Sequence, residues 1–237
     1  MLTNHRRALV LSGGMLAAGA ALCALVAVPD SLARVQEVDD AVWRFAGRVR
    51  NGPTSVTAEV LSAVGGVWVN WGLRLAAAAL LLVRRWHRQL LAFTLAVVTS
   101  ELLIGPLKAL YDRPRPPSSL IGTTAASFPS GHAVAGAVTA VSLVVVLIPP
   151  GRRRLQWEIW AIVFAFVMAS SRVYLRAHWL SDAVTGALLG GGLAVGWPAL
   201  LQTLGSRPAA TTDPAAGVVA EHNEYTPGQH GVTETGQ

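Results

Sequence analysis

The sequence predicts an all-α integral membrane protein, a bundle of six spanning helices. Of its 237 residues, 52% are hydrophobic and only 14% are charged, and the mean hydropathy is +0.46. Soluble chains carry roughly 25% charged residues, so this chain lacks the polar surface of a soluble domain. A single cysteine, Cys23, excludes a disulfide-rich scaffold.

Six apolar stretches approach the roughly 20 residues that a spanning helix needs. They lie at residues 8–28, 61–83, 90–107, 133–150, 157–171 and 179–204, within a single membrane domain over 1–204. The first stretch follows Arg6 and Arg7, as in a signal peptide, and residues 31–33 (Ser-Leu-Ala) resemble a cleavage site. Its 21 residues are long for a signal peptide, and we therefore expect a retained helix.

The segment between the first two spans predicts a short amphipathic helix over about 35–49. Apolar side chains recur there at helical spacing, at Val35, Val38, Val42, Phe45 and Val49. Such a helix can lie at the membrane surface or pack on the outer loops, and the pattern fits both. The tail, 205–237, is rich in Pro, Gly, Thr and Ala and is predicted to be disordered.

Two features inside the spans predict contacts between helices. Gly186 and Gly190 have the small-xxx-small spacing that allows close packing in membranes. Arg74 and Glu101 are charges within apolar stretches, where an unpaired charge is costly. We expect them to pair with each other or with the bundle, away from any active site.

Basic residues predict the orientation of the bundle. Arginine clusters precede the first span, follow the second and follow the fourth, at Arg6, Arg7, Arg84, Arg85, Arg88, Arg152, Arg153 and Arg154. An even number of spans separates them, so they share one side, which the positive-inside rule makes the cytoplasm. Both termini are then cytoplasmic in a multi-pass plasma membrane protein, and segments 29–60, 108–132 and 172–178 face outward. Topology thus explains much of the basic charge, without nucleic acid as a partner.

The first of three outward polar clusters follows the third span. Lys108, Arg113 and Arg115 lie within eight residues, with prolines beside the arginines. A basic anchor at the membrane edge is the plain alternative, but such anchors favour the cytoplasmic side. We therefore expect an anion site here.

The second cluster, 127–132, directly precedes the fourth span and carries Ser130, Gly131 and His132. A helix N-terminus attracts anions, and Gly131 allows a ligand to approach the backbone N–H groups. Taken alone, the cluster is better explained as an ordinary helix cap beside an incidental histidine.

The third cluster contains Arg172, His178 and Asp182. His178 and Asp182 are four residues apart and share a helix face. The carboxylate can accept a hydrogen bond from one imidazole nitrogen and leave the other free to attack. A helix-capping pair at the membrane interface is the alternative.

Taken together, the three clusters suit phosphoryl transfer on one membrane face. Cations neutralise phosphate oxygens, backbone N–H groups hold them, one histidine attacks and the other protonates the leaving oxygen. Two histidines and an aspartate are also possible zinc ligands. Five neighbouring cations, however, would repel a metal dication and attract a phosphate dianion.

The ordered set of motifs resembles the type 2 phosphatidic acid phosphatase superfamily, which also includes the haloperoxidases. In this sequence the three motifs are, in order, Lys108-x6-Arg115-Pro116, Pro129-Ser130-Gly131-His132 and Ser171-Arg172-x5-His178-x3-Asp182. The resemblance implies a six-helix core of this type that needs no metal or other cofactor. It also implies His178 as nucleophile, Asp182 as its orienting carboxylate and His132 as general acid. Phosphate binding would fall to Lys108, Arg115, Ser130, Gly131 and Arg172.

The third motif departs from the family pattern at Arg176, where glycine is frequent, and at Leu180, where proline is frequent. Arg176 is therefore a candidate for the pocket rim, where it can bind a second phosphate or be a solvated charge. Arg113 of the first cluster is a second candidate for the rim.

We expect an enzyme that hydrolyses a lipid phosphate or diphosphate at the outer membrane face through a phosphohistidine. An isoprenoid-carrier diphosphate of the undecaprenyl or decaprenyl type is the leading substrate. Phosphatidic acid, phosphatidylglycerol phosphate and transfer to an acceptor alcohol are alternatives. A non-enzymatic lipid-binding protein is the least favoured interpretation.

Overall fold

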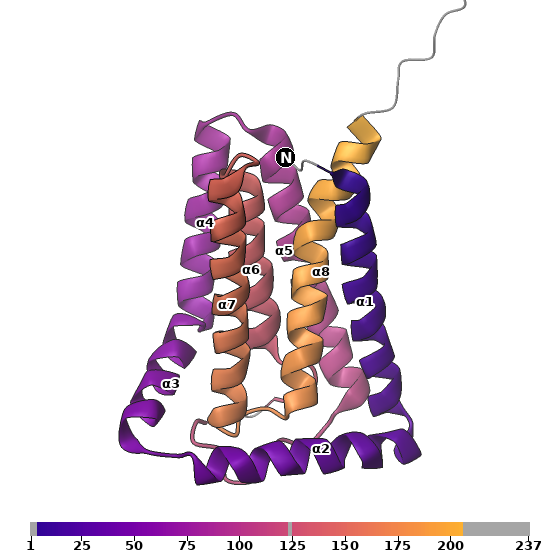
Figure 1. Cartoon of the computed structure of the whole chain (residues 1–237), viewed down its shortest axis with the longest axis vertical. Coiled ribbons are helices and arrows are strands. Elements are labelled where there is room, and N and C mark those ends of the chain that lie inside the picture. Colours follow the sequence, from indigo (N-terminus) through magenta and orange to yellow (C-terminus); the bar gives the residue numbers. More distant parts are fainter. Residues whose placement is uncertain (1–3, 123–124, 206–237) are drawn as a thin grey trace, which may run out of the picture. The chain divides into compact units, whose positions relative to one another are not determined.

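The computed structural model describes residues 4–122 and 125–205, and these form eight helices and no strand (Figure 1). The helices are α1 (His5–Ala27), α2 (Pro29–Arg48), α3 (Gly52–Val64), α4 (Val67–Val83), α5 (His87–Tyr111), α6 (Gly131–Leu147), α7 (Arg152–Tyr174) and α8 (Leu180–Gly205). The predicted all-α class is confirmed. The predicted disorder of the tail concerns residues 206–237, which lie outside the described part of the chain.

The bundle is that of a multi-pass membrane protein, but the apolar helices in the described part of the chain are not uniform. Helices α1, α5, α7 and α8 are each long and apolar enough to cross a membrane, while α6 has only 17 residues. Helices α3 and α4 qualify together as one span that is bent by 48°. The predicted bundle type is therefore right, and the predicted count of six spans is not exact.

The bend comes from two glycines in the stretch predicted as one span over 61–83. Gly65 ends α3 and Gly66 begins α4. A Cβ atom on Gly65 would lie 2.5 Å from the Met168 sulfur and 3.2 Å from His132 Cδ2. Glycine at this position therefore lets the end of α3 approach both α6 and α7.

Close packing of α8 on α6 forms the centre of the bundle. A Cβ on Gly186 would lie 2.6 Å from the Ser130 carbonyl oxygen, and one on Gly190 would lie 2.5 Å from that of Val134. These glycines do mediate helix packing, as predicted. On another side of α8, the Ser12 hydroxyl of α1 donates to the Gly192 carbonyl at 2.7 Å, so α1 packs on α8.

Helix α2 lies across one end of the bundle, at the bottom of Figure 1. It begins at Pro29, earlier than the predicted residue 35, because proline is well suited to a first helical turn. Val42 packs on apolar residues of α6, α7 and α8, and Asp39 is buried. Val38 and Phe45 remain exposed. The helix thus packs on the helices of the bundle, and its place at the membrane surface stays a prediction.

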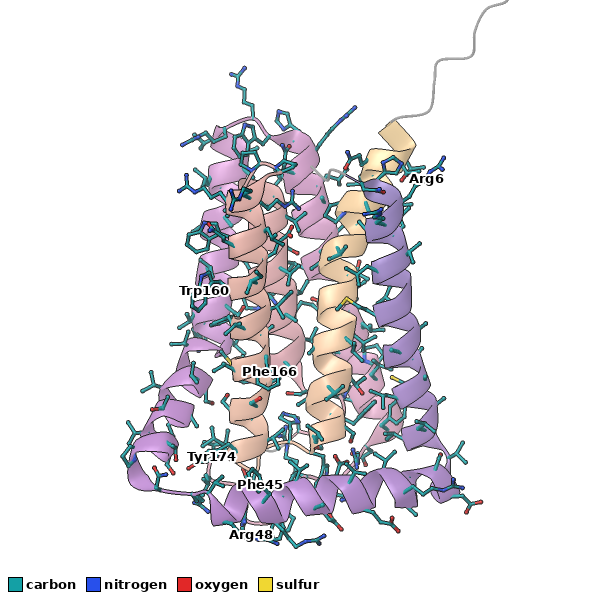
Figure 2. The ribbon with its side chains drawn as sticks, viewed as in Figure 1. Arg6, Phe45, Arg48, Trp160, Phe166 and Tyr174 are labelled. Carbon is teal, nitrogen blue, oxygen red and sulfur yellow. The ribbon has the colours of Figure 1, made fainter. Side chains whose placement is uncertain are left out.

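The two ends of the bundle carry different connections. The start of α1, the α4–α5 turn and the α6–α7 turn share one end, where Arg6 lies in Figure 2. The α5–α6 and α7–α8 connections share the other end with α2, near Arg48 and Tyr174. The three arginine clusters therefore lie opposite the three polar clusters.

Candidate active site

The third polar cluster lies where α7 connects to α8. His178 is in the connection, Asp182 is in the first turn of α8, and both side chains are buried. His178 Nδ1 lies 3.5 Å from Asp182 Oδ2. Because Nδ1 faces the carboxylate, a tautomer protonated at Nδ1 leaves the lone pair of Nε2 available.

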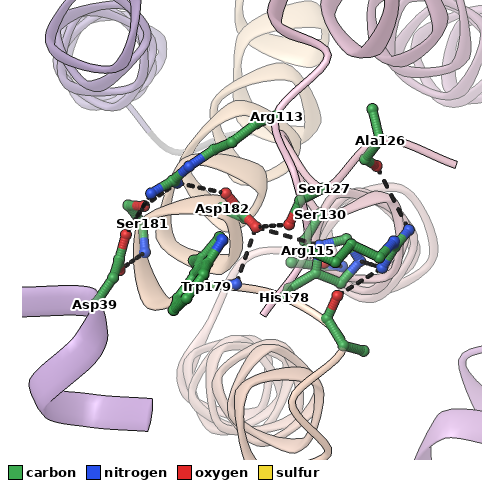
Figure 3. A network of polar contacts seen from close by, with 12 residues as sticks. Asp39, Arg113, Arg115, Ala126, Ser127, Ser130, His178, Trp179, Ser181 and Asp182 are labelled. Atoms are coloured by element: carbon green, nitrogen blue, oxygen red, sulfur yellow. Dashed lines mark hydrogen bonds and ion pairs between the residues drawn. The ribbon is translucent and has the colours of Figure 1, made fainter. Parts of the chain in front are cut away.

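The Asp182 carboxylate is held from several directions (Figure 3). Its Oδ2 accepts hydrogen bonds from the Trp179 backbone N–H at 2.9 Å and from the Ser127 hydroxyl, and its Oδ1 accepts one from Arg113 at 2.8 Å. As in a capping box, the side chain of the third helical residue, Asp182, accepts a hydrogen bond from the backbone N–H of the N-cap residue, Trp179. This bond satisfies an N–H at the start of α8 that has no partner within the helix. Local helix capping therefore fixes the carboxylate beside His178.

The other imidazole nitrogen, Nε2, faces a cation. Arg115 Nη1 lies 3.3 Å from His178 Nε2. The same guanidinium is anchored by the carbonyl oxygens of Ala125 and Ala177, each at 2.6 Å. His178 thus lies between a carboxylate on one side and a fixed positive charge on the other.

The pKa of His178 is lowered from 6.5 to about 4, mainly by burial. The Asp182 carboxylate opposes this lowering, and the charges of Arg115 and Lys108 add to it. His178 is therefore neutral near pH 7. A neutral imidazole with an available nitrogen is the form that can attack phosphorus.

Two cations of the first cluster brace the loop that precedes α6. Lys108 Nζ donates to the Ala126 carbonyl at 2.5 Å, and Arg115 Nη2 lies 3.4 Å from the same oxygen. Lys108 is in the last turn of α5 and Arg115 is in the loop beyond it, yet both reach one peptide group. The structure therefore brings these two predicted phosphate ligands together.

The second cluster forms the N-terminus of α6. Ser130 is the N-cap, and its buried hydroxyl accepts from the Ala133 N–H at 3.5 Å. Its own N–H donates to the Asp182 carbonyl at 3.1 Å, which joins the second motif to the third. No atom outside its neighbours lies within 4 Å of a Cβ built on Gly131. The space beside this glycine is open.

Ser62 of α3 links two of the predicted site residues. The buried Arg172 donates from Nη1 to the Ser62 hydroxyl, and the His132 ring is hydrogen-bonded to the Ser62 backbone. Sequence reasoning missed Ser62, because it is a lone serine in an apolar stretch. Nothing in its local pattern distinguishes it from a helix surface residue.

The two candidate rim cations occupy different places. Arg113, predicted as a possible rim residue, is buried and bonded to the Asp39 and Asp182 carboxylates. Arg176 stacks on the Trp43 ring, with Cζ 4.1 Å from the ring centroid. Arg176 thus contacts α2, and the structure does not test its role toward a second phosphate.

Sequence reasoning also missed Asp39. It is not one of the apolar positions that predict the amphipathic helix, but it is only 2% exposed and accepts from the Ser181 N–H at 2.9 Å. The one available signal was an unexplained arginine, Arg113, in a nearby outward loop.

The intramembrane charges pair as expected. Arg74 Nη1 lies 2.6 Å from Glu101 Oε1, and Arg74 Nε donates to Thr139 at 2.9 Å. Thr139 donates to Asn70, which reaches the Gly65 carbonyl at 3.2 Å. This network braces the bend between α3 and α4 and takes no direct part in the site.

Residues 4–122 and 125–205 contain no group of three or more His, Cys, Asp or Glu side chains arranged to hold a metal ion. Independence of metal stays a prediction that rests on the surplus of cations.

A membrane bundle that gathers a His–Asp pair, a second histidine and three cations at one end defines the class: a membrane phosphatase. A family model confirms it, since the PAP2 superfamily model matches residues 89–206, which contain all three motifs. The chain belongs to the PAP2 superfamily.

Solved structures share the fold. The chain resembles the transmembrane PAP2-type phosphatidylglycerolphosphate phosphatase from Bacillus subtilis with a TM-score of 0.69 and 24% identity, over 84% of this chain and 98% of that one. It resembles LpxE from Aquifex aeolicus with a TM-score of 0.54 and 22% identity, over 65% of this chain and 91% of that one. Identities this low establish the fold alone. No curated protein matches the chain significantly.

Proposed function

We propose that the protein hydrolyses a lipid phosphate or diphosphate without a metal ion, through a phosphohistidine on His178. The observation that carries this proposal is the setting of the His178 ring, with Nδ1 3.5 Å from Asp182 and Nε2 3.3 Å from Arg115. One nitrogen is oriented and the other faces a cation that would bind the phosphate under attack.

The proposed reaction has two steps. His178 Nε2 attacks phosphorus, forming an N–P bond as the P–O bond to the lipid breaks, and His132 protonates the leaving oxygen. Water then attacks phosphorus, with His132 accepting its proton, and inorganic phosphate leaves as the N–P bond breaks. Lys108, Arg115 and Arg172 neutralise the phosphate oxygens in both steps, with the Ser130 and Gly131 backbone completing the site.

The arrangement of charges supports an extracytoplasmic active site. The arginine clusters lie at the end of the bundle opposite His178, and the positive-inside rule makes that end cytoplasmic. The phosphates of an isoprenoid-carrier diphosphate at the outer membrane face would then meet the site directly. This lipid is our leading substrate.

Phosphatidylglycerol phosphate is a second candidate. It is favoured by the likeness to the Bacillus subtilis enzyme, which matches over 98% of its own length. Phosphatidic acid belongs to the same group of monoesters. Transfer of the phosphoryl group to an alcohol uses the same first step and differs only in the acceptor.

The test is phosphate release by the purified protein in detergent, with EDTA present, from a panel of these lipids. We expect turnover of at least one lipid, and His178→Ala to lower it by about 1,000-fold or more. His87→Ala is the matched control, because His87 is exposed at the opposite end of the bundle. Retained activity in His178→Ala, or a strict divalent requirement, would contradict the proposal. Adding an acceptor alcohol identifies transferase activity by its phosphorylated product.

A further inference from the structure

The Arg113 side chain connects α2 to the start of α8 through four hydrogen bonds. Nη1 donates to Ser181 Oγ at 2.7 Å and to Asp182 Oδ1 at 2.8 Å. Nη2 donates to Gln36 Oε1 at 2.7 Å and to Asp39 Oδ2 at 2.8 Å. Both terminal groups of the guanidinium therefore hold protein side chains (Figure 3), and neither is left for a substrate.

Asp39 binds the same helix start from the α2 side. Its Oδ1 accepts from the Ser181 N–H at 2.9 Å, and its Oδ2 accepts from the Ser181 hydroxyl at 2.6 Å. The first turn of α8 has N–H groups without partners inside the helix. One of them is therefore satisfied by a carboxylate from a helix about 140 residues away in the sequence.

The charges in this network depend on one another. Asp39 is 2% exposed, Arg113 is 5% exposed and Asp182 is fully buried. Each buried charge is costly unless it is paired and hydrogen-bonded. Arg113 lies within bonding distance of both carboxylates. Loss of the Asp39 carboxylate therefore alters how Arg113 holds Asp182.

The orientation of the Asp182 carboxylate in turn fixes the position of the His178 ring. Arg113 holds Asp182 by Oδ1, which leaves Oδ2 for the Trp179 N–H and the His178 ring. A rotation of the carboxylate would exchange the two oxygens or lengthen the 3.5 Å approach to His178. The bonds from Arg113 Nη2 to α2 keep the guanidinium in place and so resist this rotation.

We propose that Asp39 and Arg113 are positioning residues, through which α2 fixes Asp182 and thereby the orientation of His178. This inference rests on the function proposed above. The amphipathic helix then does more than cover the bundle, because its buried carboxylate completes the support of the active site. Neither residue touches the phosphate.

The first experiment compares Asp39→Asn with Glu37→Gln in the full chain in detergent. Glu37 is an exposed carboxylate on the same helix and serves as the matched control. We expect Asp39→Asn to lower kcat by about tenfold with KM changed less than about twofold, since misplaced catalytic groups slow the reaction without altering substrate contacts. Glu37→Gln keeps both constants. Thermal unfolding is recorded for each protein, and rates are measured where all are folded.

The second experiment separates positioning from stability. Arg113→Gln is expected to lower kcat by about tenfold, and Arg113→Lys to recover part of the loss, because lysine restores the charge without the two-pronged geometry. The double variant Asp39→Asn with Arg113→Gln loses no more kcat than Arg113→Gln alone if the two residues act as a unit. Losses in kcat that multiply in the double variant would overturn this coupling.

The outcomes are distinguishable from failure of the proposed function. If the wild type hydrolyses no lipid phosphate, the proposed function fails, and this inference fails with it before any variant is compared. If the wild type is active and folded Asp39→Asn turns over as fast as Glu37→Gln, the positioning inference alone is overturned. A lower melting temperature with unchanged kcat would likewise assign Asp39 a purely structural role.

Discussion

Exposed arginines at one end of the bundle and two buried arginines at the other end have different surroundings. At the end with the α4–α5 and α6–α7 turns, Arg84, Arg85 and Arg152 are exposed to solvent. At the end with α2, Arg113 and Arg172 are buried and hydrogen-bonded to side chains of distant helices. The proposed role of the exposed arginines in topology needs only charge, whereas the role of the two buried arginines depends on the geometry of the guanidinium. Conservative substitutions should therefore affect the two ends very differently.

The largest difference is expected between Arg172→Lys and Arg152→Lys. Lysine keeps the charge of Arg172 but loses the planar guanidinium that reaches Ser62 and that, in the proposed function, would give two donors to a phosphate. We expect kcat/KM for the best lipid substrate to fall by about 100-fold in Arg172→Lys, as when one transition-state donor is removed. Arg152→Lys is expected to match the wild type, and equal losses in both would end the comparison.

A smaller effect is expected at Ser62. Ser62→Ala removes the hydroxyl that Arg172 donates to but keeps the backbone contact with His132. We expect a loss of about tenfold in kcat/KM, the result of a misplaced cation rather than a missing one. Thr57→Ala, at an exposed position of α3, controls for helix propensity. Activity of Ser62→Ala at the wild-type level would show that Arg172 holds its place without α3.

The pH dependence sharpens the contrast between the buried and the exposed end. The pKa of His178 is lowered to about 4, so the neutral, reactive ring persists well below pH 6.5. We expect kcat/KM to be half lost only near pH 4 on the acid side, provided the fold survives. A fall of kcat/KM near pH 6.5 that persists when each of the other histidines is replaced would contradict this environment for His178.

The same lowered pKa has a consequence for stability. Between about pH 4 and pH 6.5 the unfolded chain binds a proton at His178 that the native ring does not take. Stability therefore rises with pH across this window and is lost as pH falls through it. Melting temperatures in detergent are expected to show this slope in the wild type and in His87→Gln, and a weaker slope in His178→Gln.

The sequence was sufficient for features that depend on local pattern. Apolar stretches predicted the bundle, Gly186 and Gly190 predicted its closest helix packing, and the His178–Asp182 spacing predicted the pair. All of these involve residues a few positions apart in the sequence. The expectation that His178 and Asp182 share a helix face was wrong, because His178 lies in the connection before α8 and Asp182 in the first turn of that helix.

Features that depend on distant partners were not accessible in this way. From the sequence, Asp39 and Ser62 are polar residues on predicted helices and Arg113 is a cation in a predicted outward loop. Local pattern shows which face of a helix a residue occupies, but it does not show which distant side chains cover that face. The bend at Gly65 has the same origin, since two glycines in an apolar stretch suit a straight span or a broken one. Contact with His132 and Met168 decides between them.

Backbone contacts between the second and third motifs constrain the spacing of the residues that they contribute to the site. Ser130 N–H bonds to the Asp182 carbonyl, and Gly186 brings the two helix backbones into direct contact. Interfaces packed this closely shift as single bodies rather than deform. Helices α2 and α3 meet this body through side chains, among them Asp39 and Ser62. The spacing between His178 and the N-terminus of α6 is therefore fixed by backbone contacts between α6 and α8, whereas α2 and α3 hold the site through side chains.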